Sequence, residues 1–329
     1  TLSPKVTGTG YPILVGQPQM GHSVPTIIFE VALKGGRFDA VGMSFPLWPS
    51  IPIGHNHNVT WSHMVGMCDN VDVYQEILNP LNRAEYLFNG KWRQMQKRIE
   101  RISVAGGEVK EIPIYRTVHG PVFSPFPFDP EKATADKVYT KKLAHWKKEP
   151  LSDDGWWKMM MAANASEFGQ GTSMIMTSLH TSYADTGGNI GYWHTGLNPE
   201  RVEGYDPRLP LPGTGQAEWT GRYLPNAHVI NPPKGYVTGW NNKASPDTRN
   251  PDGQNPDYMF GRYHRALWLK RSLSGRSGLD RQANEDLMKY VGGAGTYYPQ
   301  HNAYGAACKD LTPTMSRAIA VSYTHLRSH

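Results

Sequence analysis

The sequence predicts an α+β protein in which short strands outnumber helices. Residues 12–77 contain apolar, β-branched or aromatic runs such as TIIFEVAL, RFDAVGMS and NVTWSHMV, separated by Gly, Pro and Asn. Apolar runs separated in this way by turn-forming residues are typical of strands joined by short turns. With 34 Gly and 26 Pro in 329 residues, the chain is rich in turn-forming residues yet below the level of disordered proteins. Its length is sufficient for a sizeable buried core.

The middle of the chain predicts more strands and one helix. Residues 92–118 suggest strands around the turn AGGE, and the proline-rich PVFSPFPFDP that follows cannot be a central strand. A helix is expected from Ser152 or Asp153 to about Phe168, with acidic residues at its positive end. Trp156, Met160 and Ala163 recur on one face of it, which predicts core packing.

The last third predicts a hairpin and two helical stretches. In DTGGNIGYWHTG, Gly187–Gly188 turns the chain and NIGYWHT is the returning strand. One helical zone begins near Tyr263, and QANEDLMKYV carries Ala283, Leu287 and Val291 on one face. We treat residues 1–320 as one partial domain, because VSYTHLRSH (321–329) follows no recognisable pattern and is expected not to be native.

The charge of the chain does not point to nucleic acid. The net charge of +6 is spread along the sequence, and the densest basic run, KKLAHWKK, is typical of a solvated strand or loop edge. No stretch approaches the length of about 18 apolar residues that a membrane span needs. Cys68 and Cys308 match no zinc or redox spacing and identify no compartment.

Several sequence blocks, taken together, indicate a family. They are ILVGQPQMG, IPIGHN followed by VTWS, DNVDVY, YRTVHGPV, GNIGYWHTG, DPRLPLPGTG and GYVTGWNN. In this order and spacing the chain resembles the β chain of the penicillin acylase family of N-terminal-nucleophile amidohydrolases, most closely its penicillin G acylase branch. The resemblance runs from Thr1 to about Arg265 and continues weakly to Ser316. It implies an αββα sandwich, two antiparallel sheets between helical layers, incomplete at both ends.

The resemblance also implies a chemistry. The family attacks an amide with the hydroxyl of the serine that begins its β chain, and the free α-amine of that serine acts as base, since it titrates near pH 8. Autocatalytic cleavage of a precursor exposes this serine. The register of Gln19 places the nucleophile four residues before Thr1. Using Thr1 or Ser3 instead would require a deletion, so the chain is expected to be an inactive fragment that lacks its nucleophile and its α chain.

The oxyanion donors and their supports can be carried over by residue. Asn241 aligns with the side-chain donor, and a carboxamide suits this role because it donates without changing charge. Val65 aligns with the residue whose backbone N–H is the second donor. Gln19 matches the residue that holds the α-amine. Arg265 matches an arginine that orients the asparagine, although it could equally lie on a helix surface.

The acyl pocket is where the sequence departs most from the family. The aligned positions are Met20, Ile53, His63, Met67, Trp156 and Leu179. Methionines make a deformable apolar pocket, so an aliphatic or bulkier acyl group is as plausible as phenylacetyl. Each of these residues could instead be ordinary core.

A structural calcium ion is the cofactor that the resemblance implies. Its oxygen ligands would be the Asp69, Asp72 and Asp257 carboxylates, the Val71 and Pro207 carbonyls and an acidic residue of the α chain. A polar turn is the alternative reading of DNVD.

Other functions stay open. His55, His57 and His63 in GHNHNVTWSH could serve a metal-dependent hydrolase, since HxH on a strand places two rings on one face. A non-catalytic relative that only binds a ligand is a second alternative. Among enzymes, the alternative is an N-acyl-homoserine lactone acylase. The substrate is expected to be a small-molecule N-acyl amide, and the family implies a periplasmic or extracellular location.

Overall fold

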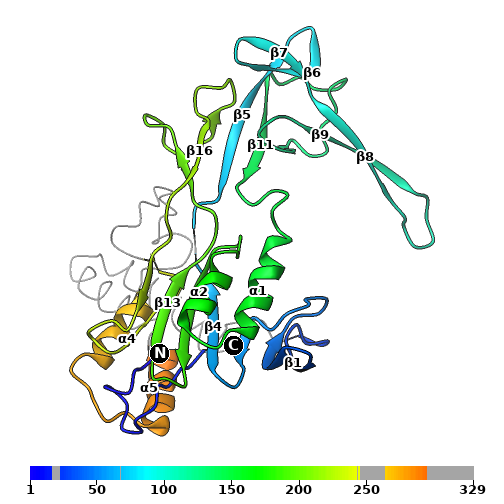
Figure 1. Ribbon diagram of the computed structural model, residues 1–329. Coiled ribbons are helices and arrows are strands. Elements are labelled where there is room, and N and C mark those ends of the chain that lie inside the picture. Colours follow the sequence, from blue (N-terminus) through cyan, green and yellow to red (C-terminus); the bar gives the residue numbers. More distant parts are fainter. Residues whose placement is uncertain (17–22, 67, 243, 245–263, 295–329) are drawn as a thin grey trace, which may run out of the picture.

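A seven-stranded antiparallel sheet forms the base of the molecule (Figure 1). The computed structural model describes residues 1–16, 23–66, 68–242, 244 and 264–294. Within these ranges the strand order is β1-β2-β3-β4-β12-β13-β17. The strands are β1 (Phe29–Gly35), β2 (Phe38–Ser44), β3 (Ile53–His55), β4 (Val59–Val65), β12 (Leu179–Asp185), β13 (Ile190–His194) and β17 (His228–Ile230).

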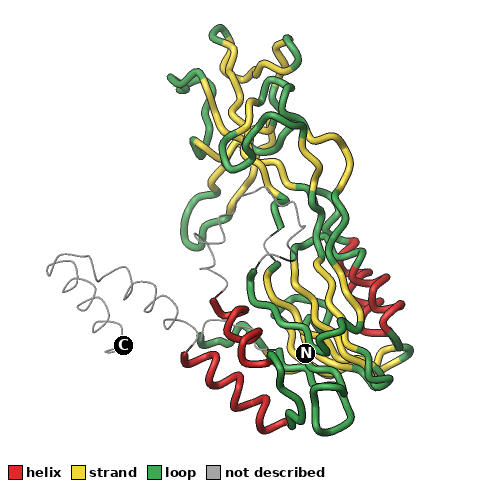
Figure 2. Tube along the Cα trace, turned by 90° about the vertical axis from the view of Figure 1, so that its left-hand side faces the viewer, coloured by secondary structure: helices red, strands yellow, loops and turns green. Residues whose placement is uncertain are grey.

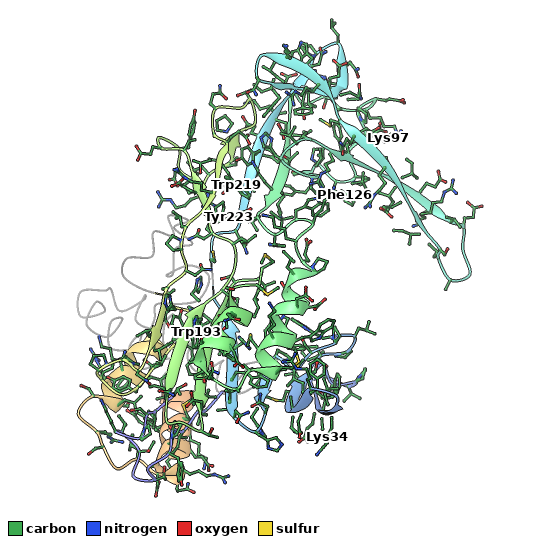
Figure 3. The ribbon with its side chains drawn as sticks, viewed as in Figure 1. Lys34, Lys97, Phe126, Trp193, Trp219 and Tyr223 are labelled. Carbon is green, nitrogen blue, oxygen red and sulfur yellow. The ribbon has the colours of Figure 1, made fainter. Side chains whose placement is uncertain are left out.

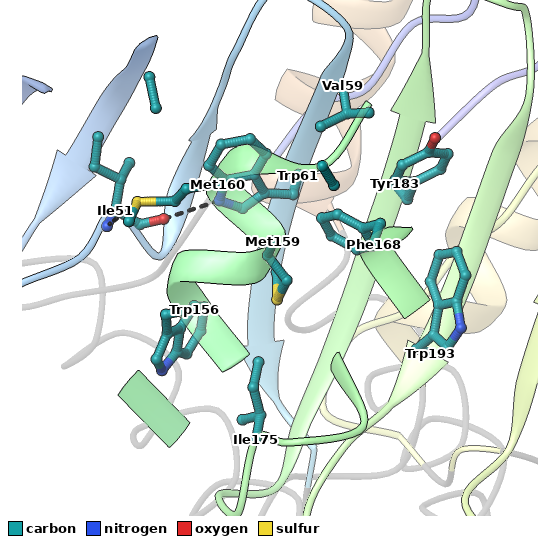
Figure 4. Close-up of a cluster of buried hydrophobic side chains, with 12 residues drawn as sticks. Ile51, Val59, Trp61, Trp156, Met159, Met160, Phe168, Ile175, Tyr183 and Trp193 are labelled. Carbon is teal, nitrogen blue, oxygen red and sulfur yellow. Dashed lines mark hydrogen bonds between the residues drawn. The ribbon is translucent and has the colours of Figure 1, made fainter. Parts of the chain in front are cut away.

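One face of this sheet is covered by helices α1 (Leu151–Met161) and α2 (Ala165–Thr172). Trp61 on β4 and Tyr183 on β12 are cross-strand partners, and both are at most 1% exposed. Phe168 of α2 packs on Tyr183 with ring centroids 4.8 Å apart (Figure 4). The Trp61 Nε1 donates to the Ile51 carbonyl oxygen at 2.9 Å, so the indole is buried with its polar group satisfied.

The helix predicted from Ser152 or Asp153 to Phe168 is two helices in the structure. Asn164 caps α2: its Oδ1 accepts from the Glu167 backbone nitrogen at 3.0 Å, and the Glu167 carboxylate accepts from the Ala163 nitrogen at 2.9 Å. This reciprocal capping competes with continuation of the first helix and ends it. Ala163 therefore lies exposed in the break, whereas Trp156 and Met160 are buried as predicted.

The opposite face of the sheet is covered by the N-terminal segment and by α4 (His264–Leu273) and α5 (Arg281–Ala294). Leu2 pairs with Ile13 on one side and with Tyr236 on the other, which gives a small second layer of extended chain. Leu287 and Val291 are buried against this layer, and Ala283 packs beside them. The order is helix, sheet, extended layer, helix, as expected for an αββα sandwich; Figure 2 shows helices on both sides of the strands.

A second sheet forms the upper part of the molecule. Its order is β10-β11-β5-β6-β7, with the short β15 pairing in parallel to β5. These strands are β5 (Val71–Asn79), β6 (Asn82–Phe88), β7 (Lys91–Gln94), β10 (Val122–Ser124), β11 (Lys137–Leu143) and β15 (Leu211–Pro212). β14 (Pro199–Arg201) and β16 (Trp219–Tyr223) form a separate pair beside it, on which Trp219 and Tyr223 are labelled in Figure 3.

Strands β8 (Gln96–Ile102) and β9 (Lys110–Arg116) form a two-stranded arm that projects from the upper sheet (Figure 1). The predicted turn AGGE lies at its tip, and Lys97 marks its base (Figure 3). Most side chains of the arm are exposed on both faces. β8 pairs with β9, the next strand along the chain, so the prediction of strands around this turn is confirmed.

A buried ionic cluster lies inside the upper sheet. His119 is sandwiched between two carboxylates: its Nδ1 lies 2.8 Å from Glu76 Oε1 and its Nε2 lies 2.5 Å from Glu218 Oε1. The Lys142 ammonium donates to the other Glu218 oxygen at 2.8 Å, and the Tyr74 ring stacks on the imidazole. Burial disfavours the imidazolium, but the hydrogen bonds that the ring donates to Glu218 and Glu76 outweigh it and raise the pKa of His119.

Several other predictions are confirmed by the strands. The hairpin β12–β13 turns at Gly187–Gly188, and Gly188 has a φ of 87°. The proline-rich stretch contributes only the edge strand β10. The basic run Lys141–Lys148 is solvated only in part, against the prediction of a solvated edge: Lys147 is exposed, but Lys142 is half-buried on the inner strand β11 and pairs with Glu218. None of the described helices has the length and apolar character to cross a membrane. Residues 321–329 lie outside the described ranges.

Candidate active site

Asn241 and Val65 meet at the end of β4. The Asn241 Nδ2 donates a hydrogen bond to the Val65 carbonyl oxygen at 2.9 Å. On the other side of β4, the Gly66 nitrogen donates to the Ser178 carbonyl at 3.0 Å, so Gly66 faces β12. Backbone groups of neighbouring residues alternate in an antiparallel ladder, and the N–H and C=O of Val65 therefore point away from β12, toward Asn241. Two N–H donors thus converge on one side of the strand end.

The chain after Val65 is held tightly. A Cβ added at Gly66 would lie 2.7 Å from the Leu179 carbonyl carbon and 2.9 Å from the His194 Nε2. The Cys68 nitrogen donates to the Ser178 Oγ at 2.7 Å, which anchors the segment again after Gly66. Only glycine fits between β12 and His194 without displacing one of them.

The N-terminal strand runs toward this point. The Thr1 backbone nitrogen donates to the Val237 carbonyl at 2.8 Å, and the Val237 nitrogen donates back to the Thr1 carbonyl at 2.9 Å. The Ser3 nitrogen donates to the Gly235 carbonyl at 2.8 Å, so the two segments are antiparallel and in register. Between this strand and the sheet lies a cavity of about 80 Å³, whose lining includes Thr1, Ser62, His180, Tyr192 and Trp240.

Three of the predicted acyl-pocket residues lie together on the helical face of the sheet. The His63 ring packs edge-on against Trp156, with centroids 4.6 Å apart. Its Nδ1 lies 2.9 Å from the Thr181 Oγ1, and burial lowers the pKa of His63 to about 3, so the imidazole is neutral. Leu179 is the cross-strand partner of Val65 and packs on the same core. Ile53 is half-buried on the neighbouring strand β3.

Some predicted site residues are not described. Gln19, Met20, Met67 and Asp257 lie outside the described ranges. Arg265 belongs to α4, whose backbone is described there, but its side chain is not. Their predicted roles stay predictions.

The two described carboxylates among the calcium candidates are engaged by an arginine. The Arg201 Nε donates to Asp72 Oδ2 at 2.8 Å, and one of its terminal nitrogens lies 2.7 Å from Asp69 Oδ2. The Trp219 Nε1 donates to the same Asp72 oxygen at 2.5 Å. Asp69 and Asp72 are at most 3% exposed, so the guanidinium neutralises two buried carboxylates.

With the Arg201 guanidinium bound to both carboxylates, the described candidate ligand oxygens leave no open site for a metal ion. Val71 and Asp72 lie at the start of β5, and Pro207 lies half-buried in the loop before β15. Across the described ranges, no three His, Cys, Asp or Glu side chains come together in a way that could hold a metal. A calcium ion would have to displace Arg201 from at least one carboxylate.

The histidines of GHNHNVTWSH are separated by the structure. The chain turns between β3 and β4, so His55 and His57 do not share a face of one strand. His57 is exposed and pairs with Asp39 at 2.8 Å, whereas His63 is buried beside Trp156. The alternative of a metal-dependent hydrolase, which needed HxH to present two rings on one strand face, is therefore wrong in its premise.

Comparison with known proteins shows the family of this chain. The family model described as penicillin amidase matches residues 1–300. The chain belongs to the penicillin amidase family. The penicillin G acylase of Escherichia coli is 34% identical over 280 residues, which cover 84% of this chain and 32% of that protein. The penicillin acylase 2 proenzyme of Pseudomonas sp. (strain SE83) is 30% identical over 268 residues, covering 78% of this chain and 32% of that protein.

One solved structure and a third relative are also similar to this member of the penicillin amidase family. The thermostable penicillin G acylase from Alcaligenes faecalis matches with a TM-score of 0.82 at 31% identity, covering 95% of this chain and 55% of that chain. An acyl-homoserine lactone acylase of Pseudomonas aeruginosa is 26% identical over 255 residues, 74% of this chain and 30% of that protein. The chain therefore spans about a third of the length of these curated relatives.

Sequence reasoning missed the residues that support the two donors. His194 lies inside the family block GNIGYWHTG and Gly66 directly follows Val65, but neither was given a role. Ser178 lies in no such block. Their importance comes from contacts between β4, β12 and β13, which no spacing along the sequence reveals.

Proposed function

We propose that the full protein is an amidohydrolase that cleaves a small-molecule N-acyl amide through an N-terminal nucleophile. The observation that carries this proposal is the convergence of the Asn241 side chain and the Val65 backbone. Two N–H donors on one side of a strand end suit an oxyanion, because a tetrahedral adduct concentrates charge on one oxygen. Both donors are neutral at any working pH.

The register of the N-terminal strand supports the place of the nucleophile. Thr1 pairs with Val237, and each further residue upstream would pair one residue further along the second segment. A continued antiparallel strand would bring the fourth residue before Thr1 opposite Asn241. This is the position that the family register assigns to the nucleophilic serine.

The proposed reaction is an acyl transfer to that serine. The serine Oγ forms a bond to the amide carbonyl carbon while its own α-amine takes the hydroxyl proton. The carbonyl oxygen becomes an oxyanion that accepts from the Asn241 Nδ2 and the Val65 N–H. Collapse breaks the C–N bond, the ammonium returns the proton to the leaving amine, and water then hydrolyses the ester by the same route.

The acyl group would lie against His63, Trp156 and Leu179. A neutral imidazole, an indole and a leucine would offer the acyl group a surface without a charge, which favours an apolar acyl chain. Phenylacetyl, phenoxyacetyl and aliphatic chains all meet this requirement. The match to an acyl-homoserine lactone acylase makes that activity the second candidate, since it too cleaves an N-acyl amide.

Three further proposals follow from the family. The chain would work together with an α chain cut from the same precursor, and one relative is named a proenzyme. A calcium ion would be structural, held by Asp69, Asp72 and Asp257 with the Val71 and Pro207 carbonyls once Arg201 had moved. The protein would be exported to the periplasm or beyond, which fractionation of cells would test.

The test needs the coding region upstream of Thr1 and the full-length protein. N-terminal sequencing of the mature β chain should find a serine four residues before Thr1. The enzyme should release amine from at least one of phenylacetyl, phenoxyacetyl and long-chain acyl amides. Turnover of acyl-homoserine lactones alone would favour the second candidate. Absence of turnover on every class would favour a non-catalytic ligand-binding relative.

A further inference from the structure

The His63 imidazole carries one buried nitrogen without a hydrogen-bond partner. His63 is 8% exposed, and its Nε2 atom has no partner among the residues that the structure describes. The neighbouring Trp156 ring lies at 80° to the imidazole, and an indole offers no acceptor stronger than its π face. Buried polar atoms of folded proteins are nearly always paired, so this nitrogen points to a polar atom of a bound molecule.

The other ring nitrogen decides whether Nε2 donates or accepts. Nδ1 lies 2.9 Å from the Oγ1 of Thr181, a fully buried residue. Within the described ranges this is the only hydrogen bond of the Thr181 hydroxyl, so the hydroxyl places its hydrogen by donating to Nδ1. Burial keeps the imidazole neutral, and a neutral ring that accepts at Nδ1 carries its hydrogen on Nε2. Nε2 is therefore an N–H donor.

His63 lies beside the proposed path of the acyl group. It precedes Val65 by two residues on β4, so the two side chains lie on the same face of the strand, roughly 7 Å apart. Leu179, the cross-strand partner of Val65, packs on the same core as Trp156. An acyl chain whose carbonyl oxygen is bound at Val65, and which lies against Leu179 and Trp156, reaches the imidazole within a few bonds.

We infer that His63 selects an acyl group that is apolar except for one oxygen acceptor a few bonds from the scissile carbonyl. The ether oxygen of phenoxyacetyl meets this description, as does the ketone of a 3-oxoacyl chain, whereas phenylacetyl and unsubstituted aliphatic chains do not. Such an oxygen pairs the buried N–H, but a methylene in its place leaves the N–H without a partner and weakens binding. The inference rests on the proposed function, because it requires an acyl group beside His63.

Matched pairs of amides test this selection in the mature full-length enzyme. Phenoxyacetyl and 3-phenylpropanoyl amides of one amine form an aromatic pair, and 3-oxooctanoyl and octanoyl amides form an aliphatic pair. In each pair, one member carries an oxygen acceptor where the other has only a methylene. The ratio of kcat/KM within a pair should be at least about tenfold higher in wild type than in His63→Phe.

Two further variants separate hydrogen bonding from packing. His63→Gln keeps a neutral N–H donor near the Nε2 position and should retain the wild-type ratio within about threefold. His228→Phe, on the exposed strand β17, is the matched control and should leave the ratio unchanged. The active fraction of a preparation cancels because each ratio is measured on one protein, and the intrinsic reactivity of the amides cancels between proteins.

A measurement on wild type alone covers the case in which His63→Phe does not fold. As competitive inhibitors, the free acids should differ, with phenoxyacetate binding at least about tenfold more tightly than 3-phenylpropanoate. Equal ratios in wild type and His63→Phe, or equal binding of the two acids, overturn the inference. A wild type that turns over no amide of either pair rejects the proposed function itself, whereas active enzymes with equal ratios reject only the role of His63.

Discussion

The Asn241 Nδ2 atom lies 2.9 Å from the carbonyl oxygen of Val65, to which it donates a hydrogen bond across 176 positions of sequence. The Asn241 carboxamide is therefore held by the backbone of Val65, and these two residues are the ones proposed to bind the oxyanion together. In this arrangement the side chain is already oriented before a substrate arrives. A donor that is oriented in advance loses little free energy to reorganisation when charge develops.

Replacement of Asn241 by alanine should lower turnover by about 100-fold or more in the mature full-length enzyme, because one of two oxyanion donors is lost. KM should change much less than kcat. Steady-state kinetics on the best amide substrate would measure both. Gln170→Ala, on the exposed face of α2, is the control and should behave as wild type. A rate near normal in Asn241→Ala would refute its role.

Gly66→Ala should damage both stability and turnover. The added methyl would lie 2.7 Å from the Leu179 backbone and 2.9 Å from the His194 Nε2, so one of them must move. Overpacking of this kind costs about 1–3 kcal/mol. Urea unfolding and kcat together would measure the effect. At Gly107, at the tip of the arm, the nearest atom to an added methyl is the Val104 Cγ1 at 3.3 Å, an exposed side chain that can move, so Gly107→Ala should be tolerated.

Arg201→Leu should destabilise the protein in the absence of calcium by about 3–5 kcal/mol, since it leaves Asp69 and Asp72 buried without their cation. Thermal unfolding in EDTA would show the loss. If calcium binds these carboxylates, added calcium should restore stability to Arg201→Leu. The same addition should not rescue the double variant Arg201→Leu/Asp72→Asn. Equal responses of the two variants would contradict the calcium proposal.

The stability of the folded protein should fall in mild acid because of His63. Burial lowers its pKa to about 3, below the ordinary value of about 6.5, so only the unfolded chain takes up a proton between these values. The contribution of the neutral His63 ring to the free energy of unfolding is fully present above about pH 6.5. It declines by about 1.4 kcal/mol per pH unit as the pH falls below that value. Urea unfolding should give a shallower pH slope in His63→Phe than in wild type, and equal slopes in the two proteins would contradict this role of His63.

His119 should act in the opposite sense. Burial lowers its pKa, but the hydrogen bonds that the ring donates to Glu218 and Glu76 outweigh burial and raise it. It therefore contributes stability that is fully present below about pH 6.5 and is lost as the pH rises through the folded pKa. His119→Gln should remove this decline, and the difference in unfolding free energy between wild type and variant should be larger at pH 6 than at alkaline pH. A difference independent of pH would show that the ring is neutral.

The strands and the hairpin were predictable because their signals are local. NVTWSHMV is a short run rich in β-branched and apolar residues that begins at Asn58, and Gly187–Gly188 supplies the turn, so β4 and the β12–β13 hairpin follow from short stretches of sequence. The helix break at Asn164 was missed although its signal is local too. Asn164 followed by Glu167 is a capping pair, but the helical spacing of Trp156 and Met160 masked it.

The proposed oxyanion donors could be predicted only from the family blocks. The residues that hold these donors in place could not be predicted, because they depend on which strands pair. The roles of Val65 and Asn241 came from aligned motifs, and the structure brings the two together. Nothing in the sequence says that His194 lies beside Gly66, because register is set by which strands pair. The same holds for Arg201, whose pairing with Asp72 joins residues far apart along the chain.

The arm made by β8 and β9 has a practical consequence. Its strands form a sheet of their own, paired from Gln96↔Arg116 out to Ile102↔Lys110. Its tip lies far from the strand end that carries Val65, as Figure 1 shows. A reporter peptide or affinity label inserted between Ile102 and Lys110 should therefore leave catalysis intact, which would provide a handle for purifying or immobilising the enzyme.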